Sequence, residues 1–183
     1  MIFDFSRIKN SKNLLAFSGG VDSSALFFLL LNHKIDFDIA IVNYNTREQS
    51  KDEIAYALNL AKEYKKEIFI KDVKLENSSN FEKNARDIRY GFFEQIIKEN
   101  SYETLITAHQ LNDRLEWFLM QLSKGAGLVE LFGIREFEEK KDYKIFRPLL
   151  NVSKDELENY LKENKIKYFI DSSNIDEKYK RNY

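Results

Sequence analysis

The sequence predicts an α/β fold, in which helices flank a parallel sheet, and three observations lead to it. Short apolar or β-branched runs alternate with longer segments whose apolar residues recur at helical spacing. A glycine-rich turn joins the first apolar run to the first helical segment. The 183 residues are 32% charged and 43% hydrophobic, which suits one globular domain. Strands that alternate with helices imply parallel pairing through right-handed crossovers.

The first half of the chain supplies three strand–helix pairs. Short runs rich in β-branched residues indicate the strands, and apolar positions three or four apart indicate the helices. In chain order the expected elements are a strand at 13–17, a helix over 25–31, a strand at 36–43, a helix over 48–65, a strand at 67–73 and a helix over 81–96.

The second half begins with a fourth strand, expected at 103–107, and a further helix. The apolar residues of this helix share one face, which we expect to point into the core: Leu111, Leu115, Phe118 and Leu122. Gly125 is a natural C-terminal stop for the helix, because glycine readily adopts the left-handed conformation found there.

The last elements are shorter. Residues 144–147 predict another strand. Ser153 and Glu156 form a capping box, which predicts a helix from there to about residue 164. Residues 167–170 are expected to form one more short strand.

The turn between the first strand and the first helix reads Ser18-Gly19-Gly20-Val21-Asp22-Ser23. Its two glycines allow a tight bend and let a ligand approach the backbone closely. Free N–H groups and the helix dipole favour an anion here, and the serine hydroxyls add donors. The turn therefore predicts a phosphate-binding loop, although it lacks the Gly-x-x-x-x-Gly-Lys-Ser/Thr pattern of the Walker type. The alternative is a turn that merely caps a helix.

The carboxyl edge of the expected sheet is where a ligand should bind. Ligands of parallel α/β sheets lie outside the carboxyl ends of the strands. Three polar segments each follow a strand directly, at 18–23, 43–47 and 108–113. The sequence therefore predicts that these segments meet in one functional site.

The loop at 18–23 resembles the signature of the PP-loop enzymes, also called N-type ATP pyrophosphatases. The resemblance implies a Rossmann-like fold of the HUP, or adenine nucleotide α-hydrolase-like, type. It also implies that ATP is cleaved between its α and β phosphates. The residues that would bind the β and γ phosphates are Ser18, Gly19, Gly20, Val21, Asp22 and Ser23.

Further segments are similar to one branch of these enzymes, the tRNA(Ile)-lysidine synthetases. In chain order the matching segments are 43–50, 82–90, 107–113 with Glu116, Phe118 and Leu119, 124–128, 147–150 and 171–182. The positions that depart from the pattern of the branch are Tyr44, Gln110, Asn112 and Arg114. The resemblance implies that residues 1–183 form the catalytic domain. Members of the branch usually continue with C-terminal regions that help to hold tRNA, so we expect either a catalytic module without these regions or a longer natural protein.

The resemblance implies a two-step reaction that uses ATP and Mg²⁺. The wobble cytidine in the anticodon loop of isoleucine tRNA is adenylated at its C2 oxygen, and free L-lysine then displaces AMP. The chain has no cysteine, which argues against the sulfur-transferring PP-loop branches. Two alternatives stay open: a synthetase that amidates or ligates a small metabolite, and a non-catalytic ATP-binding module.

The candidate catalytic side chains are Asp22, Arg86, Arg89, His109 and Asp113. Asp22 and Asp113 are also the expected Mg²⁺ ligands, because carboxylate oxygens suit this cation, but each could instead cap a helix. Arg86 and Arg89 are expected to stabilise phosphate charge, with a Glu82–Arg86 ion pair within the helix as the alternative. His109 is expected at the ligand edge, where it is catalytic or a structural hydrogen-bonding group.

Composition limits the partners and the compartment. No apolar run approaches the ~20 residues of a membrane span, and a secretory signal is lacking, so we expect a cytoplasmic protein that contacts no membrane. The absence of cysteine excludes disulfides and thiolate zinc sites. The net charge is −1, so any RNA contact has to come from a local basic patch. Whether the chain forms a homodimer stays open.

Overall fold

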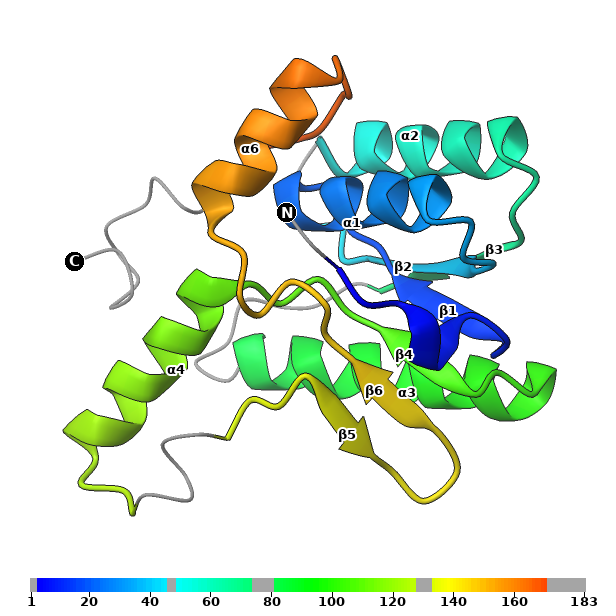
Figure 1. Cartoon of the computed structure of the whole chain (residues 1–183). Helices are drawn as coiled ribbons and strands as arrows, with labels where there is room; N and C mark the ends of the chain where they lie inside the picture. The colour runs from blue at the N-terminus through cyan, green and yellow to red at the C-terminus, as the bar shows by residue number, and fades with distance from the viewer. Residues whose placement is uncertain (1–2, 46–48, 74–80, 128–132, 171–183) are drawn as a thin grey trace.

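A computed structural model describes residues 3–45, 49–73, 81–127 and 133–170 (Figure 1). Its elements in chain order are η1 (Ser6–Ile8), β1 (Asn13–Ala16), α1 (Val21–Asn32), β2 (Asp38–Asn43), α2 (Gln49–Glu63), β3 (Ile68–Asp72), α3 (Phe81–Asn100), β4 (Thr104–Ile106), α4 (Leu111–Ser123), β5 (Phe137–Glu139), β6 (Lys144–Phe146) and α6 (Lys154–Glu163). The strands and helices expected up to residue 164 are confirmed, with ends that differ by a few residues. No helix within these ranges is long and apolar enough to cross a membrane.

The six strands form one sheet in the order β3-β2-β1-β4-β6-β5. All neighbouring strands are parallel except β5, which runs antiparallel to β6 and pairs Phe137 with Phe146. The predicted parallel sheet is therefore confirmed apart from this edge. Residues 140–143 join β5 to β6, and Lys140 N donates to the Tyr143 carbonyl at 2.8 Å. So short a connection can only join antiparallel strands, because a parallel crossover needs a dozen or more residues.

Helices cover both faces of the sheet, which is why its inner strands are apolar on both sides. Leu15 and Ile41 belong to the core that includes residues of α1, α2 and α6. Leu14 and Ala40 belong to the opposite core, which α3 covers with Phe93 and its neighbours. Figure 1 shows α1 and α2 on one side of the sheet and α3 on the other.

The strand order reverses between β1 and β4. β2 and β3 lie to one side of β1, whereas β4 and β6 lie to the other. The segments that follow β1 and β4 therefore diverge at the carboxyl edge and leave a crevice between them, the usual ligand position in such sheets. The loop at 18–23 and the segment at 107–113 border this crevice.

The expectation that the apolar face of α4 points into the core is wrong. No residue of α4 is buried, and several large apolar side chains are 40–55% exposed: Leu111, Leu115, Leu119, Met120 and Leu122. Helical spacing shows which side chains share a face but not what covers that face. α4 starts at the carboxyl edge of the sheet and leads away from the fold, so its apolar face stays outside both cores (Figure 1).

The chain beyond α4 confirms the capping box and corrects one strand. Ser153 Oγ accepts from Glu156 N, and Glu156 Oε2 accepts from Ser153 N. The short strand expected at 167–170 is instead an isolated bridge between Phe169 and Gly20. This segment runs beside the turn at 18–23 rather than beside a strand, and Phe169 N donates to the Gly19 carbonyl there.

Candidate active site

The loop between β1 and α1 is held by its own hydroxyls. Ser23 Oγ lies 3.0 Å from Ser18 Oγ and accepts from Ser18 N at 3.2 Å. Ser24 Oγ donates to the Gly19 carbonyl at 3.2 Å. Gly19 has a φ of +79°, a left-handed conformation that glycine adopts without strain. Gly20 is the N-cap of α1 and receives no side-chain cap. The first N–H groups of α1 can therefore serve an anionic ligand, as the sequence predicted.

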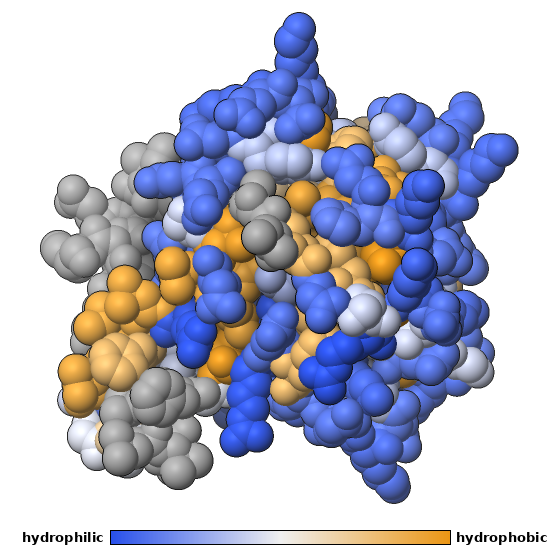
Figure 2. Space-filling view, viewed as in Figure 1, coloured by the Kyte–Doolittle hydropathy of each residue, from blue (hydrophilic) through white to orange (hydrophobic). Residues whose placement is uncertain are grey.

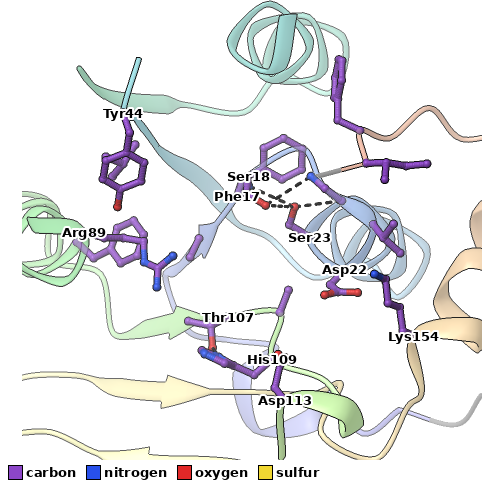
Figure 3. A pocket seen from close by; sticks show the side chains of 18 of the residues that line it. Phe17, Ser18, Asp22, Ser23, Tyr44, Arg89, Thr107, His109, Asp113 and Lys154 are labelled. Atoms are coloured by element: carbon purple, nitrogen blue, oxygen red, sulfur yellow. Dashed lines mark hydrogen bonds between the residues drawn. The ribbon is translucent and has the colours of Figure 1, made fainter. Parts of the chain in front are cut away.

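A cavity of about 350 Å³ opens over this loop (Figure 3), a size typical of small-ligand sites. All three segments expected at the carboxyl edge contribute to its lining, and α3 and α6 complete it. The lining residues used below are Ser18, Gly20, Val21, Asp22, Ser23, Tyr44, Arg89, Thr107, His109, Asp113, Lys154 and Glu158. The predicted meeting of the three segments is thereby confirmed, except for Thr46 and Arg47, which lie outside the described residues.

Asp22 points into the cavity and carries an unsatisfied oxygen. Its Oδ1 is buried without a hydrogen-bond partner, and the side chain does not cap α1. Burial raises the pKa of the Asp22 carboxyl to about 6, with further contributions from the charges of Asp113 and Glu158, while Lys154 lowers it. A carboxylate that is held among other carboxylates and lacks a partner is stabilised by a cation, so Asp22 fits the role of a Mg²⁺ ligand.

Asp113 has two roles in the structure. Its Oδ2 accepts from Gln110 N at 2.9 Å and so completes the capping box of α4, in which Gln110 is the N-cap. The side chain also lines the cavity. Within the described ranges, no group of three or more His, Asp or Glu side chains could hold a metal ion alone. A Mg²⁺ between Asp22 and Asp113 would therefore need water and phosphate oxygens as further ligands, which is the usual pattern for this ion.

His109 lines the cavity after the end of β4 and is partly buried. Its Nδ1 is 2.9 Å from Thr107 Oγ1, which fixes the ring and leaves Nε2 available to a ligand. The pKa of His109 is lowered to about 4, chiefly by burial; the charge of Asp113 raises it, and those of Arg147, Arg89 and Arg86 contribute to lowering it. The imidazole is therefore neutral at physiological pH.

The two candidate arginines differ in position. Arg89 lines the cavity, whereas Arg86 does not. Both guanidinium groups stand over the ring of Tyr90, at 5.6 Å for Arg86 and 5.9 Å for Arg89. The structure therefore brings Arg89 to the site together with Asp22, His109 and Asp113, and leaves Arg86 at its margin. The Glu82 side chain lies outside the described residues, and so does the segment at 171–182.

The side chains at the four positions that depart from the family pattern all form hydrogen bonds with other parts of the fold. Tyr44 Oη donates to the Ala85 carbonyl at 2.8 Å, which ties the end of β2 to α3. Gln110 accepts from Asn112 N at 2.7 Å, and Asn112 Oδ1 accepts from Lys154 N at 3.4 Å. Arg114 donates to Asn151 Oδ1 at 3.1 Å. These side chains brace the walls of the cavity.

Sequence reasoning missed the contribution of α6. Lys154 and Glu158 line the cavity beside Asp22, because α6 packs along α1 and its first turns reach the loop at 18–23. The capping box predicted the helix but not the element on which it packs. One signal was available: Lys154 is the first residue of the helix, where a positive charge opposes the helix dipole. A cation at that position suggests a role outside the helix itself.

Residues 3–183 match the family model of the PP-loop domain. The chain is 56% identical over 176 residues to tRNA(Ile)-lysidine synthase from Campylobacter jejuni strain RM1221, which covers 96% of this chain and 54% of that protein. It is 53% identical over 184 residues to tRNA(Ile)-lysidine synthase from Helicobacter hepaticus, which covers 98% of this chain and 43% of that protein. The chain thus spans about half the length of these relatives.

Solved structures share the fold. The U34-tRNA thiolase NcsA from Methanococcus maripaludis superposes with a TM-score of 0.74 at 22% identity, over 91% of this chain and 61% of that one. The NH3-dependent NAD synthetase from Campylobacter jejuni superposes with a TM-score of 0.56 at 18% identity, over 88% and 68%. At these identities the likeness shows a shared fold alone.

Proposed function

Because this chain belongs to the PP-loop domain family, we propose that it is the catalytic domain of a tRNA(Ile)-lysidine synthetase. The observation that carries the proposal is the loop at 18–23, whose free helix N-terminus opens into a cavity that also holds Asp22, Arg89 and His109. The identity of 56% to a tRNA(Ile)-lysidine synthase supports the choice of branch. The substrates follow as isoleucine tRNA, ATP and free L-lysine, in the cytoplasm.

The first step joins the tRNA to AMP. The C2 oxygen of the wobble cytidine attacks the α-phosphorus of ATP, and the bond between that phosphorus and the α–β bridging oxygen breaks. Pyrophosphate leaves with the electron pair. The loop N–H groups and Ser18 and Ser23 orient the β and γ phosphates, and Arg89 offsets the charge that gathers on the α-phosphate.

Asp22 and Asp113 would hold Mg²⁺, which supplies charge neutralisation for the triphosphate when it is bound. The orphaned Oδ1 of Asp22 supports this assignment. Gly20 lines the cavity without a side chain and so keeps the backbone there open to the phosphates.

The second step replaces AMP by lysine. The ε-amine attacks C2, the C2–O bond breaks with its electrons moving to AMP, and the amine loses a proton. His109 is neutral and presents Nε2, so it suits a hydrogen bond that positions the base or the amine. A pKa near 4 makes it a poor general base at neutral pH.

We also propose that the chain forms a homodimer through α4. The apolar face of α4, formed by Leu111, Leu115, Leu119 and Leu122, lies within one helical stripe and has no cover in the described structure. Figure 2 shows these apolar side chains gathered over α4. Two such faces would bury on the order of 1,000 Å², the lower limit for a specific interface. The same face on both copies suits two-fold symmetry.

Pyrophosphate release separates the proposal from its two alternatives. The chain is incubated with ATP, Mg²⁺ and an isoleucine tRNA transcript that carries cytidine or adenosine at the wobble position. Release that requires the cytidine transcript is expected. Lysine should accelerate turnover, whereas norleucine, which lacks the ε-amine, should not. Release without tRNA would favour a synthetase for a small metabolite, and no release with intact ATP binding would favour a non-catalytic module.

A further inference from the structure

We infer that Lys154 binds the departing pyrophosphate and is the cation that the phosphate loop itself lacks. The inference rests on the proposed cleavage of ATP between its α and β phosphates. The loop at 18–23 contains no basic residue, and its one charged side chain, Asp22, is an acid that repels phosphate. Phosphate loops of the Walker type carry a lysine within the loop for this purpose. In this chain the positive charge comes from Lys154, at the start of α6.

The position of Lys154 meets the geometric requirement. It is the first residue of α6, it is half-buried, and it lines the cavity next to Asp22. Figure 3 shows its side chain reaching toward Asp22 at the start of α1. The backbone N–H of Lys154 donates to Asn112 Oδ1 at 3.4 Å, which ties this turn of α6 to α4. The ammonium is therefore presented from a braced helix end.

Lys154 is not simply the counterion of a neighbouring carboxylate. Among the residues the structure describes, none forms a hydrogen bond with its ammonium or an ion pair within 4.0 Å. Asp22 and Glu158 also line the cavity, and the charge of Lys154 lowers the pKa of Asp22 by longer-range attraction. A positive charge at a helix N-terminus is unfavourable, because the helix dipole places partial positive charge there. An anionic ligand would remove this penalty.

The second cation of the cavity is on another wall. Arg89 comes from α3, beside Tyr44 and on the side opposite α6 (Figure 3). Lys154 adjoins the N-terminus of α1, where the β and γ phosphates are expected. The two cations therefore have different roles: Arg89 faces the α-phosphate, and Lys154 faces the pyrophosphate. When the bond to the α-phosphorus breaks, the former bridging oxygen gains negative charge, and a nearby ammonium stabilises it.

Binding of inorganic pyrophosphate to the full chain tests this role without requiring turnover. Lys154→Met keeps the length of the side chain and removes its charge, whereas Lys154→Arg keeps the charge. Lys141→Met is the matched control, because Lys141 is exposed in the turn between β5 and β6, at the opposite edge of the sheet. Titration calorimetry should show about tenfold weaker pyrophosphate binding for Lys154→Met, near wild-type binding for Lys154→Arg, and no change for Lys141→Met.

Two results would overturn the inference. One is wild-type pyrophosphate affinity in Lys154→Met. The other is a loss in Lys154→Met that is confined to the KM for lysine, which would assign Lys154 to the substrate carboxylate. Failure of the proposed function looks different: pyrophosphate binding would still depend on Lys154, while no tRNA would be modified. Unchanged thermal unfolding of the Lys154 variants confirms that each is folded.

Discussion

The backbone N–H of Phe169 donates to the carbonyl of Gly19 at 2.9 Å, so the segment after α6 clamps the phosphate loop. The ring of Phe169 extends this contact, because its Cδ2 would lie 3.5 Å from a Cβ at Gly19. Tyr56 Oη secures the same segment by donating to the Lys167 carbonyl at 2.6 Å. The conformation of the loop therefore depends on residues that are distant in sequence.

Gly19 should be the least replaceable residue of the loop. Its φ of +79° would strain alanine by about 1–2 kcal/mol, and the larger valine would also press against Phe169. We expect Gly19→Ala to weaken ATP binding and Gly19→Val to abolish it, as measured by calorimetry. Gly91→Ala is the control: no atom lies within 4 Å of its Cβ position on α3, so it should raise stability by up to about 1 kcal/mol. Wild-type ATP affinity in Gly19→Val would refute the assignment of the loop.

Asp22→Asn should separate stability from function. The pKa of Asp22 is raised from 3.8 to about 6, so the folded state binds a proton more tightly than the unfolded state. The resulting stabilisation is complete below pH 4 and is lost as the pH rises through about 6. At pH 7.5 the metal-free Asp22→Asn protein should therefore be more stable than wild type, by roughly 2–3 kcal/mol, yet inactive with Mg²⁺.

Thermal unfolding at pH 4 and pH 7.5 measures this difference. The advantage of Asp22→Asn should shrink as the pH falls. If Asp22→Asn is less stable than wild type at pH 7.5, the carboxylate is satisfied in the fold and is not reserved for a cation. Full Mg²⁺-dependent turnover of Asp22→Asn would remove it as a metal ligand.

His109 should titrate far below an ordinary histidine. Burial lowers its pKa from 6.5 to about 4, so the neutral form is favoured in the folded state. Its contribution to stability is present above pH 6.5 and is lost as the pH falls toward 4, the opposite direction to that of Asp22. Proton NMR can follow the imidazole signal that disappears in His109→Asn. A midpoint near 6.5 for that signal would contradict a buried, neutral ring.

The apolar face of α4 should cause self-association. Leu115→Glu places a charge in the centre of the proposed dimer interface and should yield monomers in sedimentation velocity experiments. Leu58→Glu is a matched control, because Leu58 on α2 is 45% exposed but lies apart from α4. It should leave the dimer intact. A wild-type chain that is monomeric at tens of micromolar would contradict the proposed dimer.

The sequence predicted most of the fold because its signals are local. Alternation of strand and helix predicted the sheet, and the loop at 18–23 predicted the carboxyl-edge site. The misjudged face of α4 and the overlooked Lys154 have one cause in common. Periodicity shows which side chains share a face, whereas the element that covers the face is decided by tertiary packing. The bridge between Phe169 and Gly20 was not predicted for the same reason, because it joins residues far apart in the chain.

The most direct test of the account is the identity of the wobble nucleoside after reaction. Isoleucine tRNA transcript is incubated with the chain, ATP, Mg²⁺ and lysine, then digested to nucleosides and analysed by mass spectrometry. The account predicts that cytidine at the wobble position gains the mass of lysine less one water, and only when both ATP and lysine are present. An unmodified wobble cytidine, while the chain cleaves ATP with a small molecule in place of tRNA, would contradict it.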